Sequence, residues 1–85
     1  MRGKRQDLPA VPYWDSGYYG KAARRAAAMS TDAIHGWIGS AVSGMYRAMQ
    51  DHKNDGRPES LQEMQEGLTA AYALVAELRA RQEEG

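Results

Sequence analysis

Apolar residues in the last third of the chain recur at alternating spacings of three and four, which is the period of an amphipathic helix. The pattern predicts one long helix over 58–82. Its apolar stripe consists of Leu61, Met64, Leu68, Ala71, Val75 and Leu78. A stripe of this width needs a covering surface, so we expect it to form the core of the molecule.

A second long helix is predicted over 32–52. It is hydrophobic on more than one side, because apolar residues flank its main stripe. The stripe is Ile34, Ile38, Ala41, Met45 and Ala48, and the flanking residues are Trp37, Val42, Tyr46 and Met49. Three capping residues in a row, 30–32, precede this helix, and the turn-forming run 53–57 follows it. The short connection predicts that the two long helices pack antiparallel as a hairpin.

Small residues at spacings of four, Gly36, Ser40 and Gly44, form a ridge on the second helix. Glycine inside a helix costs about 1 kcal/mol relative to alanine, so we expect a compensating contact. A close crossing by another backbone would supply it. The alternative is that the glycines simply kink the helix.

A shorter helix is predicted over 17–29. Tyr18, Ala22, Ala26 and Met29 share one face, which is lined by alanine at its centre. Such a face permits close approach but buries little area. Residues 1–12 show no periodicity and contain two prolines, so we expect a flexible basic arm there, followed by one helical domain over 13–85.

These patterns predict an all-α protein in which a short N-terminal helix precedes a long antiparallel helical hairpin. Two helices cannot hide the broad apolar surface of 32–52. Either the first helix closes a bundle of three, or two copies pair into a dimeric helical bundle. Because the first helix offers mainly methyl groups, we favour the homodimer.

Composition narrows the possible functions. The 85 residues include no cysteine, and neither histidine lies in a cluster typical of structural zinc, so we expect no disulfide, metal or cofactor. No apolar run is long enough for a membrane span, which favours a cytoplasmic protein without a membrane partner. The excess of arginine over lysine and the abundance of alanine are typical of bacteria with GC-rich genomes.

The net charge of zero conceals an asymmetry. Residues 1–25 carry six basic and two acidic side chains, a balance of +4, which leaves −4 on the remainder. A basic N-terminal part and an acidic remainder can attract one another between copies, or the N-terminal part can bind another partner.

No catalytic motif is recognisable, so we expect a binding protein and no enzyme. The expected role is that of a regulatory, adaptor or inhibitor protein that binds a protein partner. The residues expected to contact the partner are Tyr13, Trp14, Tyr18, Tyr19, Trp37 and Met49. The alternative is a dimeric nucleic-acid-binding regulator, since basic and aromatic side chains bind phosphates and stack on bases. Its basic residues would be Arg2, Lys4, Arg5, Lys21, Arg24 and Arg25.

The tripeptide Trp37-Ile38-Gly39 resembles the W-x-G signature of the Trp-X-Gly family of small secreted helical hairpins. That family has the tripeptide at the bend between its helices, whereas here it falls inside a predicted helix. The family also has an acid four residues after a tyrosine, where this chain has Ala76 after Tyr72. The resemblance covers three residues, keeps secretion open as an alternative, and is not adopted as an assignment.

Overall fold

The computed structural model describes residues 16–84, which form three α-helices with no strand among them. The helices are α1 (Ser16–Ala27), α2 (Thr31–Asp55) and α3 (Pro58–Glu84). The all-α prediction is confirmed. The expected arm over 1–12, and with it Tyr13 and Trp14, lies outside the described residues.

Both ends of α2 are defined by capping interactions. The side-chain Oγ of Ser30 accepts a hydrogen bond from the backbone N–H of Ala33 at 3.1 Å, so the first of the three capping residues is the N-cap. At the other end Gly56 adopts a left-handed backbone with φ 67°, and its N–H donates to the carbonyl of His52 at 2.8 Å. The helix therefore extends to Asp55, three residues beyond the predicted end.

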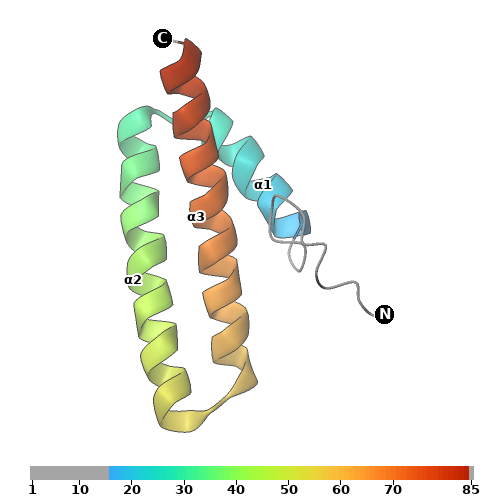
Figure 1. Cartoon of the computed structure of the whole chain (residues 1–85), viewed down its shortest axis with the longest axis vertical. Helices are drawn as coiled ribbons and strands as arrows, with labels where there is room; N and C mark the ends of the chain where they lie inside the picture. Colours follow the sequence, from blue (N-terminus) through green and yellow to red (C-terminus); the bar gives the residue numbers. More distant parts are fainter. Residues whose placement is uncertain (1–15, 85) are drawn as a thin grey trace.

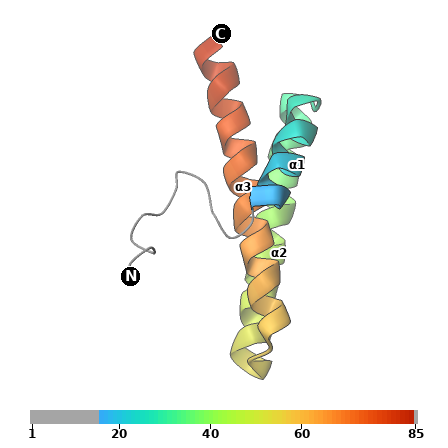
Figure 2. The same ribbon diagram turned by 90° about the vertical axis from the view of Figure 1, so that its right-hand side faces the viewer.

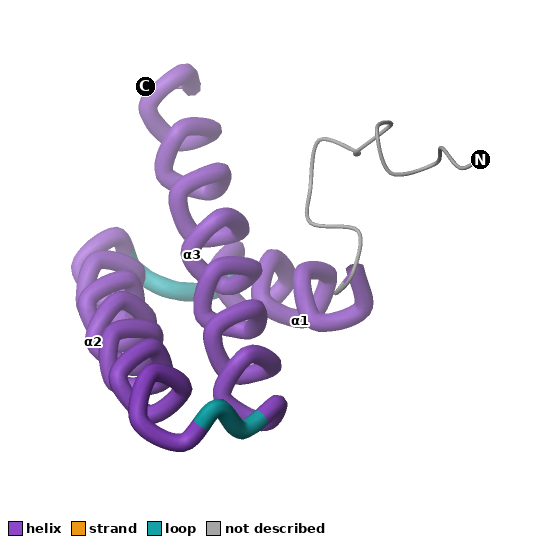
Figure 3. The backbone as a smooth tube through the Cα atoms, turned by 60° about the horizontal axis from the view of Figure 1, so that its bottom comes forward, coloured by secondary structure: helices purple, strands orange, loops and turns teal. Residues whose placement is uncertain are grey.

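Helix α3 is the central element, because both other helices pack against it. Helices α2 and α3 run side by side in opposite directions, and α1 lies on the other side of α3 (Figure 1). The view from that side places α1 nearest the reader (Figure 2), and the tube view shows α3 between the other two (Figure 3). The side chains of α3 are therefore divided between two helical neighbours.

The core of the described chain is small. Its fully buried apolar residues are Ala22, Ala26, Ile34, Ala48, Ala70, Ala73 and Leu74. Only Ile34 and Leu74 are large, and they meet Ala26 where the three helices come together. Burial of an alanine removes little apolar area from water, so this core contributes little hydrophobic stabilisation for its number of residues.

The described helices cover the expected α3 stripe only in part: Met64, Ala71 and Leu78 are partly buried, and Leu78 packs against the core. Leu61, Leu68 and Val75 remain close to half exposed. The buried residues of α3 are instead Ser60, Thr69, Ala70, Ala73 and Leu74. Small side chains let α1 and α2 approach the α3 backbone from two sides, which a row of leucines would prevent. Thr69 tolerates this burial because its hydroxyl donates to the carbonyl of Gln65 at 2.8 Å.

The close crossing of helices occurs at Gly67 and not along the predicted ridge. A Cβ added to Gly67 would overlap the side chain of Met45 and lie 3.4 Å from the carbonyl oxygen of Ala41. A Cβ added at Gly36 or Gly44 meets nothing within 4 Å among the described residues. The expectation that another backbone crosses the α2 ridge is thus wrong for this part of the chain.

We expect Gly67→Ala and Gly36→Ala to change stability in opposite directions. Alanine at 67 must displace Met45, so the variant should lose about 1 to 2 kcal/mol of unfolding free energy despite its better helix propensity. Alanine at 36 meets open space and should gain up to about 1 kcal/mol. Urea unfolding at one fixed protein concentration measures both changes. Equal effects of the two substitutions would contradict the assigned crossing.

Candidate functional site

Six large apolar side chains of the described helices are each 43–60% exposed. They are Val42, Tyr46, Leu61, Leu68, Tyr72 and Val75, and we call them the exposed apolar face. Their combined exposed area is on the order of 500 Å², near the upper end of the largest apolar patch on ordinary monomers. Patches of this size are often functional, so the exposed apolar face is a candidate interaction surface.

The six side chains share one side of the α2/α3 pair. With about 100° of rotation per residue, the four on α3 fall within an arc of about 60° and the two on α2 within about 40°. Glu63 and Glu66 each point about 150° away from the centre of the α3 arc, and Ser40 and Arg47 point about 140° and 120° away from the centre of the α2 arc. Those four residues line a groove between the two helices, so the exposed apolar face lies on the side opposite this groove.

The exposed apolar face carries no charged side chain over its length. Helical phase places the charged residues nearest to its centre at Lys53 in α2 and Arg79 in α3, at its two ends. On α2 the edge of the exposed apolar face is polar at Tyr46, whose hydroxyl accepts a hydrogen bond from the side-chain amide of Gln50 at 2.7 Å. An uncharged, mainly aliphatic surface suits an apolar partner and would leave an ionic ligand without compensating charges.

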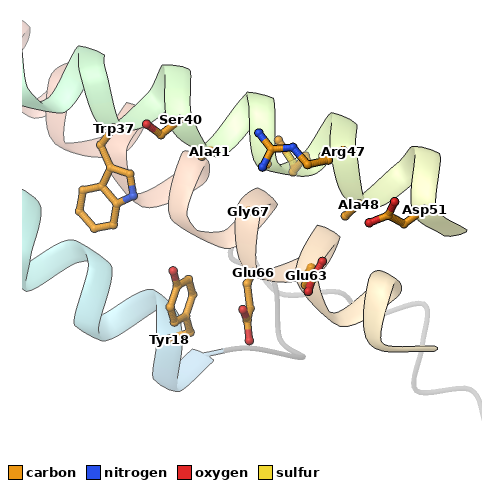
Figure 4. A pocket seen from close by; sticks show the side chains of 12 residues that line it. Tyr18, Trp37, Ser40, Ala41, Arg47, Ala48, Asp51, Glu63, Glu66 and Gly67 are labelled. Atoms are coloured by element: carbon orange, nitrogen blue, oxygen red, sulfur yellow. The ribbon is translucent and has the colours of Figure 1, made fainter. Parts of the chain in front are cut away.

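The groove on the opposite side has a volume of about 330 Å³ and mixed chemistry. Tyr18 of α1 and Trp37 of α2 lie at one end, and Glu66 of α3 faces the same opening (Figure 4). Towards the other end the groove is lined by Glu63 of α3 and Asp51 of α2 (Figure 4). The groove therefore combines an aromatic end with a carboxylate-rich end.

Aromatic contacts tie α1 to both other helices. The guanidinium of Arg25 lies 5.5 Å from the ring centroid of Trp37, within the range of a cation–π interaction. On α3, the ring of Tyr72 meets Tyr19 edge-on, with centroids 5.9 Å apart and planes at 74°. Tyr72 therefore bounds the exposed apolar face where α1 begins.

The residues predicted to contact a partner are thus divided between different surroundings. Tyr18 and Trp37 share the groove, whereas Tyr19 packs against α3. Met49 is half-buried and, by helical phase, lies on the side of the exposed apolar face. Leu61, Leu68 and Val75 were missed as surface residues because their spacing resembles that of a core stripe. The signal that identifies them is the run of small residues beside them, which occupies the contacts with α1 and α2.

The basic residues of the nucleic-acid alternative are described only in part. Lys21, Arg24 and Arg25 are exposed on α1, and Arg25 also contacts Trp37. The first three of the set, Arg2, Lys4 and Arg5, lie outside the described residues. Three exposed cations on one short helix form a modest positive surface.

Arg81 joins the end of α1 to α3. Its Nη2 donates to the carbonyl oxygens of Ala26 at 3.1 Å and Met29 at 2.7 Å, and its Nη1 donates to the hydroxyl of Thr31 at 3.0 Å. The guanidinium is held in place by Glu77, whose carboxylate accepts from Nε at 2.9 Å. The Ala26 carbonyl also accepts from the backbone N–H of Met29 at 3.0 Å, so Arg81 adds a charged donor to the turn that follows α1 and joins this turn to α3.

We expect Arg81→Ala to lower the unfolding free energy by about 2 to 3 kcal/mol. The variant loses hydrogen bonds from a charged donor, and the carbonyls of Ala26 and Met29 lose that donor. Arg81→Lys should recover only part of this, since an ammonium lacks the planar fork that spans several acceptors. Arg24→Ala, an exposed arginine on α1, should stay within about 0.5 kcal/mol of the wild type. Denaturant unfolding compares the three variants, and equal losses for Arg81→Ala and Arg24→Ala would contradict the role of Arg81.

Comparisons with known proteins found no match to a family model, to a curated protein or to a solved structure. Across residues 16–84, no helix combines the length and hydropathy needed to cross a membrane. The same residues contain no group of three or more histidine, aspartate or glutamate side chains placed to hold a metal ion. The functional inference is therefore carried by the exposed apolar face and the groove.

Proposed function

We propose that the protein is a small non-enzymatic helical interaction module that pairs with a second copy of itself and serves a regulatory or adaptor role by binding a protein partner. The observation that carries this proposal is the exposed apolar face. Six large apolar side chains lie on one uncharged side of α2 and α3, while the core behind them is built mostly from alanine.

The balance between core and surface supports pairing. The described chain buries only two large aliphatic side chains completely and leaves six large apolar ones near half exposed. Covering those six would remove from water the apolar area that folding of the single chain leaves exposed. A homodimer therefore completes the hydrophobic core that one copy lacks.

The groove supports a second contact, with a protein partner. Tyr18 and Trp37 are the partner-contacting residues of this proposal, and Glu63 and Glu66 supply negative charge beside them. Aromatic residues are frequent anchors of protein interfaces. The carboxylates favour a partner segment that carries lysine or arginine.

The proposal is tested by oxidative footprinting of the purified chain across a dilution series, with mass spectrometry of Tyr46, Leu68 and Tyr18. In a homodimer, oxidation of Tyr46 and Leu68 slows several-fold at high concentration and rises on dilution. Tyr18, in the groove, should oxidise at the same rate throughout. Rates at Tyr46 and Leu68 that stay equally fast at every concentration would contradict pairing through the exposed apolar face.

The nucleic-acid alternative draws support from the exposed Lys21, Arg24 and Arg25. It predicts binding of DNA or RNA with an affinity that falls linearly on a log–log plot against salt concentration, because phosphate contacts release counterions. The protein-partner proposal predicts no such binding. A steep salt dependence that is lost in Lys21→Ala/Arg24→Ala would favour the alternative.

A further inference from the structure

We infer that two copies pair through the exposed apolar face across a two-fold axis that runs perpendicular to the helices and passes beside Leu68. In this arrangement α3 packs antiparallel on the partner's α3, and α2 on the partner's α2. The inference rests on the proposed homodimer and adds its geometry. The partner that covers the exposed apolar face is a second copy of the chain, and the complex is a bundle built from two α2/α3 pairs.

The levels of the residues along the two helices follow from one contact. Gly67 lies against the side chain of Met45, so these residues stand at the same height in the antiparallel pair. Counting away from this contact in opposite directions places Leu68 level with Gly44. Residue 44 is the midpoint between Val42 and Tyr46, so the apolar residues of both helices are centred at one height.

Three of the four apolar residues that α3 contributes to the face, Leu61, Leu68 and Val75, are symmetric about this height, whereas Tyr72, which packs against Tyr19, has no counterpart on the face. Leu61 and Val75 each lie seven residues from Leu68, which is two helical turns or about 10 Å on either side. An axis across the helices at this height brings Leu68 against its own copy and Leu61 against the partner's Val75. Such a self-complementary pattern is what an isologous interface requires.

A two-fold axis parallel to the helices fits the pattern less well. It would place α3 of one copy against α2 of the other, so Leu61 and Val75 would face the ends of the α2 stripe. Those ends lie beyond Val42 and Tyr46, near the heights of Asp51 and Trp37. The longer α3 stripe is matched in length only by another α3 stripe.

Area and charge agree with a second copy as the occupant. Two faces of about 500 Å² bury on the order of 1,000 Å² from these side chains alone, which reaches the lower limit for a specific interface. Because the faces carry no charge over their length, two identical copies meet without like-charge repulsion. Each copy covers the apolar surface of the other, and no additional ligand is needed.

Single cysteines test the geometry sharply, because the chain contains none of its own. The full-length variants Leu68→Cys, Leu61→Cys, Val75→Cys, Tyr46→Cys and Ser43→Cys are oxidised and resolved by mass. At an interaxial distance of about 10 Å, facing Cα atoms approach within disulfide range. Leu68→Cys should therefore form a cross-linked dimer by itself, while Ser43→Cys, which points about 80° from the centre of the face, should not.

Leu61→Cys and Val75→Cys complete the test. Each alone should stay uncross-linked, because the axis separates identical residues by about 21 Å, whereas a mixture of the two should cross-link. Cross-linking of Leu68→Cys only when mixed with Tyr46→Cys would overturn this geometry and leave the proposed homodimer standing. Absence of any cross-link, together with a solution mass of one chain, would overturn both.

Discussion

The variant Leu68→Glu is expected to be a folded monomer at concentrations where the wild-type chain is dimeric. Leu68 is half exposed in the single chain, so a glutamate there leaves the packing of α1, α2 and α3 intact. In the pair, the two-fold axis brings the two introduced carboxylates together in an apolar surrounding. Burial of unpaired charge at the centre of an interface should raise the dissociation constant by about 1,000-fold or more.

Sedimentation velocity measures this effect, and circular dichroism checks that the helices persist. Ser43→Glu is the matched control, because it adds the same charge to an exposed position turned away from α3. The control should remain dimeric. If Leu68→Glu dissociated no more than Ser43→Glu did, the exposed apolar face would not be the site of pairing.

The second large effect is expected from Leu74→Ala. Leu74 is fully buried where the three helices meet, and it is one of only two large aliphatic side chains in that position. Truncation to alanine removes its contacts and leaves a cavity, which costs about 2 to 5 kcal/mol. A domain of this size has a net stability of only a few kcal/mol, so most of the variant should be unfolded at 37 °C.

Leu74→Met provides the comparison, because it conserves volume and should cost less than about 1.5 kcal/mol. Thermal unfolding followed by circular dichroism, at equal concentrations of both variants, gives the two values. A loss below 1 kcal/mol for Leu74→Ala would show that the alanine-rich contacts alone hold the helices together, contrary to the described core.

The helical character of the chain could be predicted from its sequence because it depends on local signals. Ser30 caps α2 with its own side chain, and Gly56 ends the helix with the left-handed backbone that glycine readily adopts. The apolar repeats of α2 and α3 each run over many residues, and only a short turn separates the two helices. Ala22 and Ala26 face inward as the period of the first helix predicts.

The choice of the buried face could not be predicted from periodicity. The hydrophobic stripe of α3 and its row of small residues are two competing solutions for packing, and a helical period alone does not rank them. The structure uses Gly67, Ala70 and Ala73 for the contacts within the chain, and Leu61 and Leu68 are left to the surface. The tertiary role of Arg81 was also not predictable, because its acceptors lie 50 to 55 residues earlier in the chain.

Sedimentation equilibrium of the wild-type chain at micromolar concentration bears most directly on whether the apolar side of α2 and α3 is covered by another copy. Association through this surface predicts a mass of twice the 9.4 kDa chain, falling towards one chain on dilution. A constant mass of 9.4 kDa over the whole range would contradict it.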